Sequence, residues 1–142
     1  MKALFVRDLM TRPVHTLHRT ANLAEVNALM ERVRIRHVPI TEDGDVLVGL
    51  VTHRDLLRRA MGGGETLPES IRGPYLRSLP VRDMMQSKLV TTGPDVPLVE
   101  AARLMVENKF GCLPVVQDGR LVGILTESDF VRQAAGLDEG GR

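Results

Sequence analysis

The sequence predicts an α/β protein, of the α+β kind, made of two β-α-β-β-α units packed with pseudo-twofold symmetry. The first observation behind this prediction is an internal repeat, because residues 6–60 recur at 81–134. The second is that hydrophobic patterns follow one another in the same order in both copies. The third is length: in a chain of 142 residues, each copy has too little apolar surface to fold well alone.

Each copy is predicted to begin with a short strand, at residues 14–17 and 89–92, where apolar and β-branched residues cluster. An amphipathic helix with one buried face should follow, because apolar residues recur at helical spacing. The residues that set this spacing are Leu23, Val26, Met30 and Val33 in the first copy, and Leu98, Ala101 and Met105 in the second.

A β-hairpin is predicted next in each copy. Residues 37–40 and 112–116 lead into an Asp-Gly turn, and a nearly all-apolar run follows that turn. This pattern indicates a hairpin whose second strand is buried on both faces. A second helix should follow each hairpin, over about residues 52–60 and 126–135.

These patterns define the predicted organisation of the chain. We expect a first repeat at 1–62, a linker at 63–79, a second repeat at 80–136 and a flexible tail at 137–142. Glycines and prolines are dense between the copies, so the linker should be a connecting loop with one short turn around residues 69–72.

Composition excludes several classes of protein. The formal net charge is +1 and only 3% of residues are aromatic, which argues against nucleic-acid binding. No apolar run approaches the length of a membrane span, and the beginning of the chain lacks a signal-peptide pattern. With a single cysteine, Cys112, there is no internal disulfide. We therefore expect a cytoplasmic protein that contacts neither nucleic acid nor membrane.

One motif occurs at the same place in both copies. Residues 49–55 and 123–129 share the pattern Gly, two apolar residues, Thr, two variable residues, Asp. Together with the upstream Pro39 or Pro114, the Asp-Gly turn and the Val-Arg-Asp-x-Met opening, this motif resembles the cystathionine β-synthase (CBS) domain pair. The resemblance implies two clefts between the repeats that accept AMP, ADP, ATP or S-adenosylmethionine. It also implies a homodimer.

The resemblance implies roles for individual residues. In the CBS family the motif's Thr and Asp contact the ribose hydroxyls, and the backbone beside the Pro-containing strand helps to frame the adenine. The residues carried over are Thr52, Asp55, Thr126 and Asp129 for the ribose, and Thr16, Val38, Pro39, Thr91, Leu113 and Pro114 for the adenine pocket.

Chemistry supports the ribose role, because a carboxylate accepts two hydrogen bonds from a vicinal diol. Thr-x-x-Asp before an apolar helix is also a capping box, which would stabilise the helix without any ligand. The occurrence of the motif in both copies favours ribose contact, and the two roles can coexist.

The copies differ in charge where a phosphate would lie. The resemblance implies that residues just before the Pro-containing strand and just before the motif Asp of one repeat reach the phosphate of a nucleotide. That nucleotide is held by the Asp of the other repeat. The candidates are Arg36, His37 and Arg54, which predicts that the Asp129 site is the stronger one. The alternative is that these cations form an ordinary solvated surface.

The remaining candidates are weak. The spacing of His15, His18, His37 and His53 does not fit a metal site, so we expect none. Cys112 is interpreted as a small core residue, with redox sensing as an alternative.

No nucleophile with a partner base is apparent, so we expect no enzyme and no cofactor. We predict a regulatory module that senses an adenine nucleotide or S-adenosylmethionine and signals through conformation or assembly, to an effector protein not identified by the sequence. The main alternative is a constitutive dimerisation scaffold with no nucleotide ligand.

Overall fold

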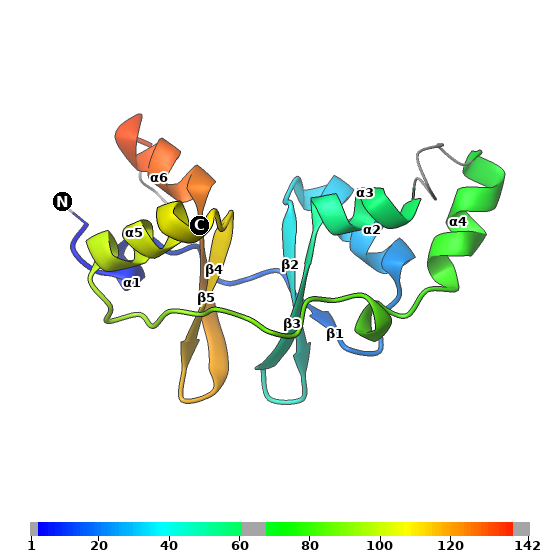
Figure 1. The fold of residues 1–142 in the computed structure, drawn as a ribbon, viewed down its shortest axis with the longest axis horizontal. Coiled ribbons are helices and arrows are strands. Elements are labelled where there is room, and N and C mark those ends of the chain that lie inside the picture. The colour runs from blue at the N-terminus through cyan, green and yellow to red at the C-terminus, as the bar shows by residue number, and fades with distance from the viewer. Residues whose placement is uncertain (1–2, 61–67, 138–142) are drawn as a thin grey trace. The chain divides into compact units, whose positions relative to one another are not determined.

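A computed structural model describes residues 3–60 and 68–137, and its α-helices and β-strands confirm the mixed α/β class (Figure 1). The chain forms two compact units that do not follow the repeat boundaries, because the opening of each repeat belongs to the unit that holds the rest of the other repeat. Unit 1 comprises Met1–Val14, Gly44–Leu47 and Val90–Arg142, and unit 2 comprises His15–Asp43 and Val48–Leu89.

The elements of unit 2 come mainly from the first repeat. They are β1 (Leu17–His18), α2 (Leu23–Val33), β2 (His37–Glu42), most of β3 (Val46–Thr52), α3 (His53–Ala60), α4 (Glu69–Arg77) and the 3-10 turn η1 (Val81–Asp83). The strand order is β1-β2-β3, and β1 runs parallel to β2 with Leu17 opposite Ile40. The predicted strand at 14–17 therefore begins too early, because the pairing with β2 involves Leu17 and His18.

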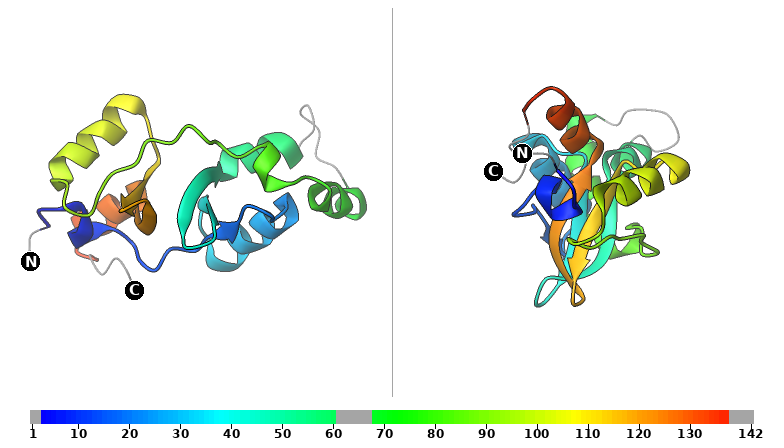
Figure 2. Two further views of the ribbon diagram at one scale, coloured as in Figure 1. Left: turned by 90° about the horizontal axis from the view of Figure 1, so that it is seen from below. Right: turned by 90° about the vertical axis from the view of Figure 1, so that its left-hand side faces the viewer.

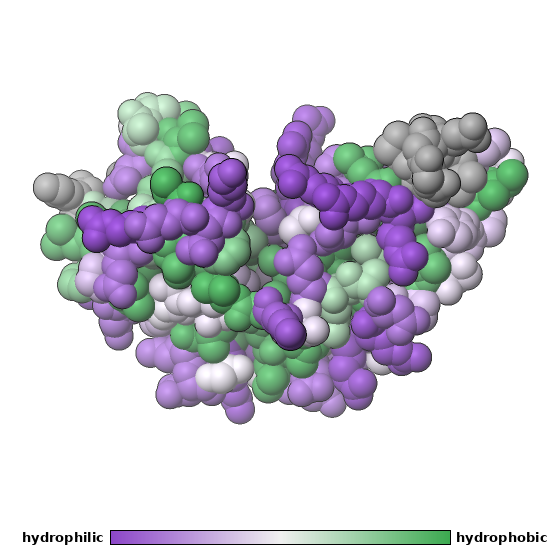
Figure 3. Space-filling model, in the orientation of Figure 1, coloured by the Kyte–Doolittle hydropathy of each residue, from purple (hydrophilic) through white to green (hydrophobic). Residues whose placement is uncertain are grey.

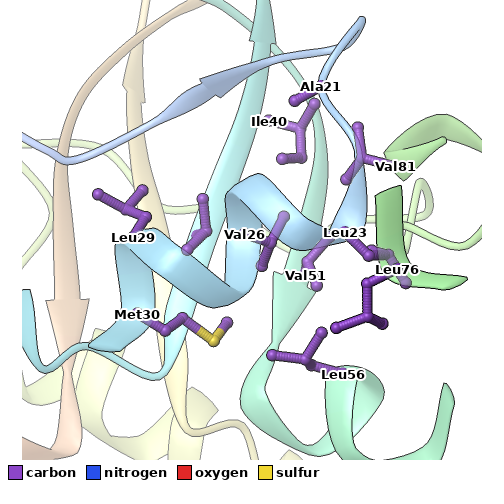
Figure 4. Close-up of a cluster of buried hydrophobic side chains, with 11 residues drawn as sticks. Ala21, Leu23, Val26, Leu29, Met30, Ile40, Val51, Leu56, Leu76 and Val81 are labelled. Carbon is purple, nitrogen blue, oxygen red and sulfur yellow. The ribbon is translucent and has the colours of Figure 1, made fainter. Parts of the chain in front are cut away.

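Helix α2 forms where helical spacing predicted it, and local chemistry explains its first residue. Asn22 Oδ1 accepts a hydrogen bond from the Glu25 amide at 3.0 Å, and the Asn22 amide donates to Glu25 Oε2 at 3.2 Å. This capping box satisfies backbone groups at the helix start. The apolar face is then buried in the unit 2 core. Figure 4 shows this core, which includes Leu23, Val26, Leu29, Met30, Ile40, Val51, Leu56, Leu76 and Val81.

Helix α4 corrects the prediction for the linker, where we expected only one short turn. It runs over Glu69–Arg77 despite an internal proline, Pro74. Leu76 is only 2% exposed and packs beside Leu56 in the unit 2 core (Figure 4). Burial of this leucine offsets the hydrogen bond that Pro74 cannot donate, which the local sequence pattern does not reveal. The beginning of the predicted linker, at 63–67, lies outside the described residues, as does the tail beyond Leu137.

Unit 1 is built mainly from the second repeat. Its elements are α1 (Val6–Leu9), α5 (Leu98–Asn108), β4 (Cys112–Gln117), β5 (Arg120–Thr126) and α6 (Glu127–Ala134). Strands β4 and β5 form an antiparallel hairpin with Leu113 opposite Leu125, and its turn places Asp118 and Gly119 at positive φ. Helix α1 contacts α6 within this unit, and the left view of Figure 2 shows α1, in dark blue, beside α6.

The strand predicted at 89–92 is reduced to a single parallel bridge, Thr92 to Val115. Pro94, which has no amide hydrogen to donate, limits the pairing beyond residue 93, whereas residues 89–91 form no bridge.

The segment that opens each repeat packs closely on a motif glycine. A side-chain Cβ on Gly123 would lie 3.0 Å from Met10 Cγ, and one on Gly49 would lie 2.7 Å from Met85 Cγ. Thr11 then forms an antiparallel bridge with Ile124. Glycine is favoured at the two motif positions because a larger residue would force a methionine side chain to move.

Candidate functional site

The carboxylate of Asp55 lies in the first turn of α3, directly after β3 in unit 2. Its Oδ2 accepts hydrogen bonds from the Thr52 amide at 3.0 Å, from the Thr52 hydroxyl at 2.9 Å and from Gln86 Nε2 at 3.0 Å. The Asp55 amide donates to the Thr52 hydroxyl at 3.2 Å. Asp55 is half-buried, and its Oδ1 accepts no hydrogen bond from the residues that the structure describes.

Asp129 holds the corresponding place at the beginning of α6, after β5 in unit 1. Its Oδ2 accepts from the Thr126 amide at 2.8 Å and from the Thr126 hydroxyl at 3.1 Å. Its Oδ1 accepts from the Thr11 hydroxyl at 2.8 Å. Asp129 is 4% exposed, and among the residues that the structure describes only it and Thr41 are buried and polar.

Both Thr-Asp pairs therefore cap the helices that follow them. This is the structural role that the sequence left open beside ribose binding, and it stabilises the helix start whether or not a ligand is present. Sequence reasoning missed the outer partners, Thr11 and Gln86. A signal existed, because both directly follow the repeated Val-Arg-Asp-x-Met opening.

The residues predicted to frame an adenine differ in their exposure. Val38, Pro39, Leu113 and Pro114 are fully buried, so their side chains fill the cores and only their backbone could face a ligand. In unit 1 the Pro-containing strand pairs directly with the strand that leads to Asp129, with Cys112 opposite Thr126. The two predicted threonines are less buried: Thr16 is half-buried and Thr91 is exposed.

Thr91 lines a pocket of about 580 Å³ in unit 1 that the sequence did not predict. The pocket lies between the segment around Thr91 and α5, which contributes Glu100, Arg103 and Glu107. Asp129 and Thr126 are not among its lining residues, so this pocket is separate from the candidate ribose contacts.

The cationic residues predicted for phosphate all belong to unit 2. Arg36 and Arg54 are exposed and His37 is half-buried. The His53 amide donates to the Arg36 carbonyl at 2.8 Å, which holds the segment before β2 against the first turn of α3. The backbone therefore gathers these positions around a helix N-terminus, where the helix dipole also favours an anion.

Cys112 is a core residue. Burial raises the pKa of its thiol to about 12, so the group stays protonated at neutral pH. Because the thiolate is the reactive form, the burial and raised pKa of the Cys112 thiol argue against the redox-sensing alternative.

A second pocket, of about 590 Å³, lies between α5 and α6 in unit 1 and is mainly apolar. Val106 and Val131 on its lining are 78% and 66% exposed. Figure 3 shows hydrophobic atoms over α6 at the upper left. The full lining is Ala102, Met105, Val106, Lys109, Phe110, Glu127, Phe130 and Val131.

Within residues 3–60 and 68–137, His, Cys, Asp and Glu side chains nowhere form a group of three that could hold a metal ion. None of the described helices has the length and apolar character that crossing a membrane requires.

Comparison with known families identifies both repeats. The family model for the CBS domain matches residues 6–62 and again residues 81–136. Among curated proteins, MJ1404 of Methanocaldococcus jannaschii is 32% identical over 99% of this chain, which spans only 34% of that relative. YhcV of Bacillus subtilis, a CBS domain-containing protein, is 31% identical over 87% of this chain and is covered over 81% of its own length.

Solved structures share the whole fold. A Vibrio cholerae protein assigned to acetoin utilization (AcuB) is 39% identical with a TM-score of 0.80, covering 96% of this chain and 93% of its own. CBSX2 in complex with AMP is 30% identical with a TM-score of 0.77, covering 95% and 98%. The CBS domain pair of MJ0100, in complex with 5′-methylthioadenosine and S-adenosyl-L-methionine, is 25% identical with a TM-score of 0.77, covering 93% and 96%.

Proposed function

Because the chain belongs to the CBS-domain family, we propose that it is a regulatory module that binds an adenosine-containing ligand. The solved relatives support this class of ligand, since CBSX2 is in complex with AMP and the MJ0100 pair with 5′-methylthioadenosine and S-adenosyl-L-methionine. The chain spans about a third of the length of MJ1404. The proposal therefore concerns ligand binding by the two CBS repeats, and not the activity of a larger protein.

The observation that carries the proposal is the pair of Thr-Asp motifs at the starts of α3 and α6. Each places a carboxylate at a helix N-terminus, directly after a strand. A carboxylate that retains open acceptor positions fixes the two hydroxyls of a ribose in orientation as well as in affinity. We assign Asp55 and Asp129 to the ribose hydroxyls.

Phosphate recognition is the second part of the proposal. Arg36, His37 and Arg54 surround the start of α3, and the charge of the two arginines supports binding of an anionic group by unit 2. Charge-assisted hydrogen bonds to phosphate are strong, so AMP should bind more tightly than adenosine. Arg54→Ala should remove most of this difference and leave adenosine binding unchanged.

Thermal denaturation with AMP, ADP, ATP and S-adenosylmethionine tests the proposal directly. A ligand present at a hundred times its Kd stabilises the folded state by about 2.7 kcal/mol, which appears as a clear rise in Tm. GMP serves as the control for base recognition. If none of the four adenosine compounds changes the Tm, the sensing function is wrong.

We propose that the module has no enzymatic activity and signals through conformation or self-assembly. A bound ligand changes such an equilibrium only by its different affinity for the two states. The apolar pocket between α5 and α6 supports assembly into a homodimer, and it also favours the second candidate function, a scaffold that dimerises without any nucleotide. Native mass spectrometry of freshly purified protein distinguishes the two, because it reports subunit count and retained nucleotide together.

A further inference from the structure

We propose that the two candidate ribose sites are unequal and that Thr11 closes the one at Asp129, so that the first adenosine ligand binds at Asp55. This inference rests on the proposed function. It reverses the order that the cationic residues and the CBS resemblance together predicted from the sequence.

The hydrogen bonds of Asp129 carry the first step. An ionised carboxylate offers about four lone-pair positions, two on each oxygen. At Asp129 the Thr126 amide and hydroxyl occupy both positions on Oδ2, and the Thr11 hydroxyl occupies one on Oδ1. One position remains for a diol that has two hydrogen bonds to donate. The carboxylate is also buried, since Asp129 is only 4% exposed.

Asp55 is arranged differently. All three of its acceptor contacts, from the Thr52 amide, the Thr52 hydroxyl and Gln86, fall on Oδ2, so the three donors share the two positions of that oxygen. Its Oδ1 accepts nothing from the described chain, so both positions on that oxygen are open. Asp55 is half-buried and therefore more accessible than Asp129. A ribose can donate both hydroxyls here without displacing a protein group.

The difference arises at one position of the repeat. Thr11 and Gln86 are matched residues, each directly after the opening motif, and each is fixed by a pair of backbone hydrogen bonds. The Thr11 amide donates to the Ile124 carbonyl at 2.8 Å and the Ile124 amide donates to the Thr11 carbonyl at 3.1 Å. With its backbone held in this way, Thr11 must rotate its side chain to release Oδ1. Ligand binding at Asp129 therefore has to replace an existing bond, whereas binding at Asp55 adds new ones.

Isothermal titration calorimetry with AMP tests the inference on the full chain. Relative to the wild type, Asp55→Asn should weaken the tightest AMP-binding event by at least tenfold, as expected for loss of a charge-assisted hydrogen bond. Asp129→Asn should change that event by less than threefold. Asn keeps an acceptor for the helix cap in both variants, and circular dichroism verifies that each is folded.

Thr11→Val frees Oδ1 of Asp129 and should strengthen the weaker binding event about tenfold, or make it detectable. Thr11→Ser is the matched control, because it keeps the hydroxyl and should leave both events as in the wild type. This pair also tests the inference if Asp129→Asn fails to fold.

Each result has one meaning. A larger loss from Asp129→Asn than from Asp55→Asn overturns the proposed order, as does a Thr11→Val variant that binds AMP like the wild type. If neither AMP nor S-adenosylmethionine binds the wild type at all, the sensing function itself fails, and the inference fails with it.

Discussion

Asp8 shows how a single carboxylate organises the beginning of the chain. Its Oδ2 accepts hydrogen bonds from the Leu4 amide at 3.0 Å and the Phe5 amide at 2.9 Å, at the N-terminus of α1. These backbone hydrogen bonds, with Arg7 nearby, lower the pKa of Asp8 below 3.8. The ionised form is therefore favoured in the folded state.

A pH dependence follows from this shift. A carboxyl whose pKa is depressed by folding contributes stability above its unfolded pKa, and that contribution is lost as the pH falls through the folded pKa. Asp8→Asn should lower the Tm at pH 7, and the difference from wild type should shrink progressively below pH 3.8. Thermal melts between pH 7 and pH 2 measure this.

Asp83, the matched residue of the second copy, provides the control. No hydrogen bond to its carboxylate is found within residues 3–60 and 68–137. Asp83→Asn should therefore have a smaller effect on the Tm at pH 7. An equal effect of the two variants would contradict the capping role of Asp8.

At the scale of elements, the contact between a strand and an opening segment explains the motif glycines. An alanine at position 49 would place its Cβ 2.7 Å from Met85 Cγ and 3.1 Å from Met85 Cβ. Gly49→Ala should thus lower the free energy of unfolding by about 1–3 kcal/mol through overpacking. Urea denaturation measures the change.

Two comparisons sharpen this test. Gly73→Ala in α4 meets only the end of Arg77, at 3.5 Å, so it should be neutral or stabilising. Combining Gly49→Ala with Met85→Ala should cost less than the sum of the single changes, because the smaller side chain removes the clash. Strictly additive costs would mean that Met85 is not the obstacle.

The packing of helix α4 leads to a prediction about the stability of the protein. Leu76→Ala should lower the free energy of unfolding by about 2–5 kcal/mol, since this side chain is 2% exposed in the unit 2 core. Ile71→Ala, in the same helix but 55% exposed, should change it by no more than about 0.5 kcal/mol. Similar costs for the two variants would show that α4 is not part of the core.

At the scale of the whole molecule, self-assembly is the main open prediction. Val106 and Val131 are largely exposed beside the apolar pocket of α5 and α6. Exposure of this apolar surface to water is unfavourable for a monomer and favours burial against a second copy. We expect native mass spectrometry to find a dimer, and the double variant Val106→Glu, Val131→Glu to be monomeric. Val90→Glu, at a 44% exposed site outside these helices, is the control and should remain dimeric. A monomeric wild type would contradict the homodimer.

The site could be predicted in part. The Thr-x-x-Asp pairs were found because a capping box is a short, local pattern, and the hydrogen bonds of Asp55 and Asp129 confirm the caps. The outer partners could not be found in this way. Thr11 and Asp129 are 118 residues apart in the chain, so the repeated opening motif marks the position of Thr11 but does not reveal that it pairs with Asp129.

The sequence by itself determined the duplicated unit and the order of its helices and hairpins, because these depend on side-chain spacing over a few residues. Its repeated motifs also carried the resemblance to the CBS family. Only the tertiary structure decided that the opening of each repeat packs in the other repeat's unit, that α4 continues past Pro74, and that the Thr11 hydroxyl donates to Asp129 Oδ1 whereas Asp55 Oδ1 accepts no hydrogen bond within the described residues. Those outcomes depend on which distant surfaces exclude water together, and burial of that kind is a property of the folded chain as a whole.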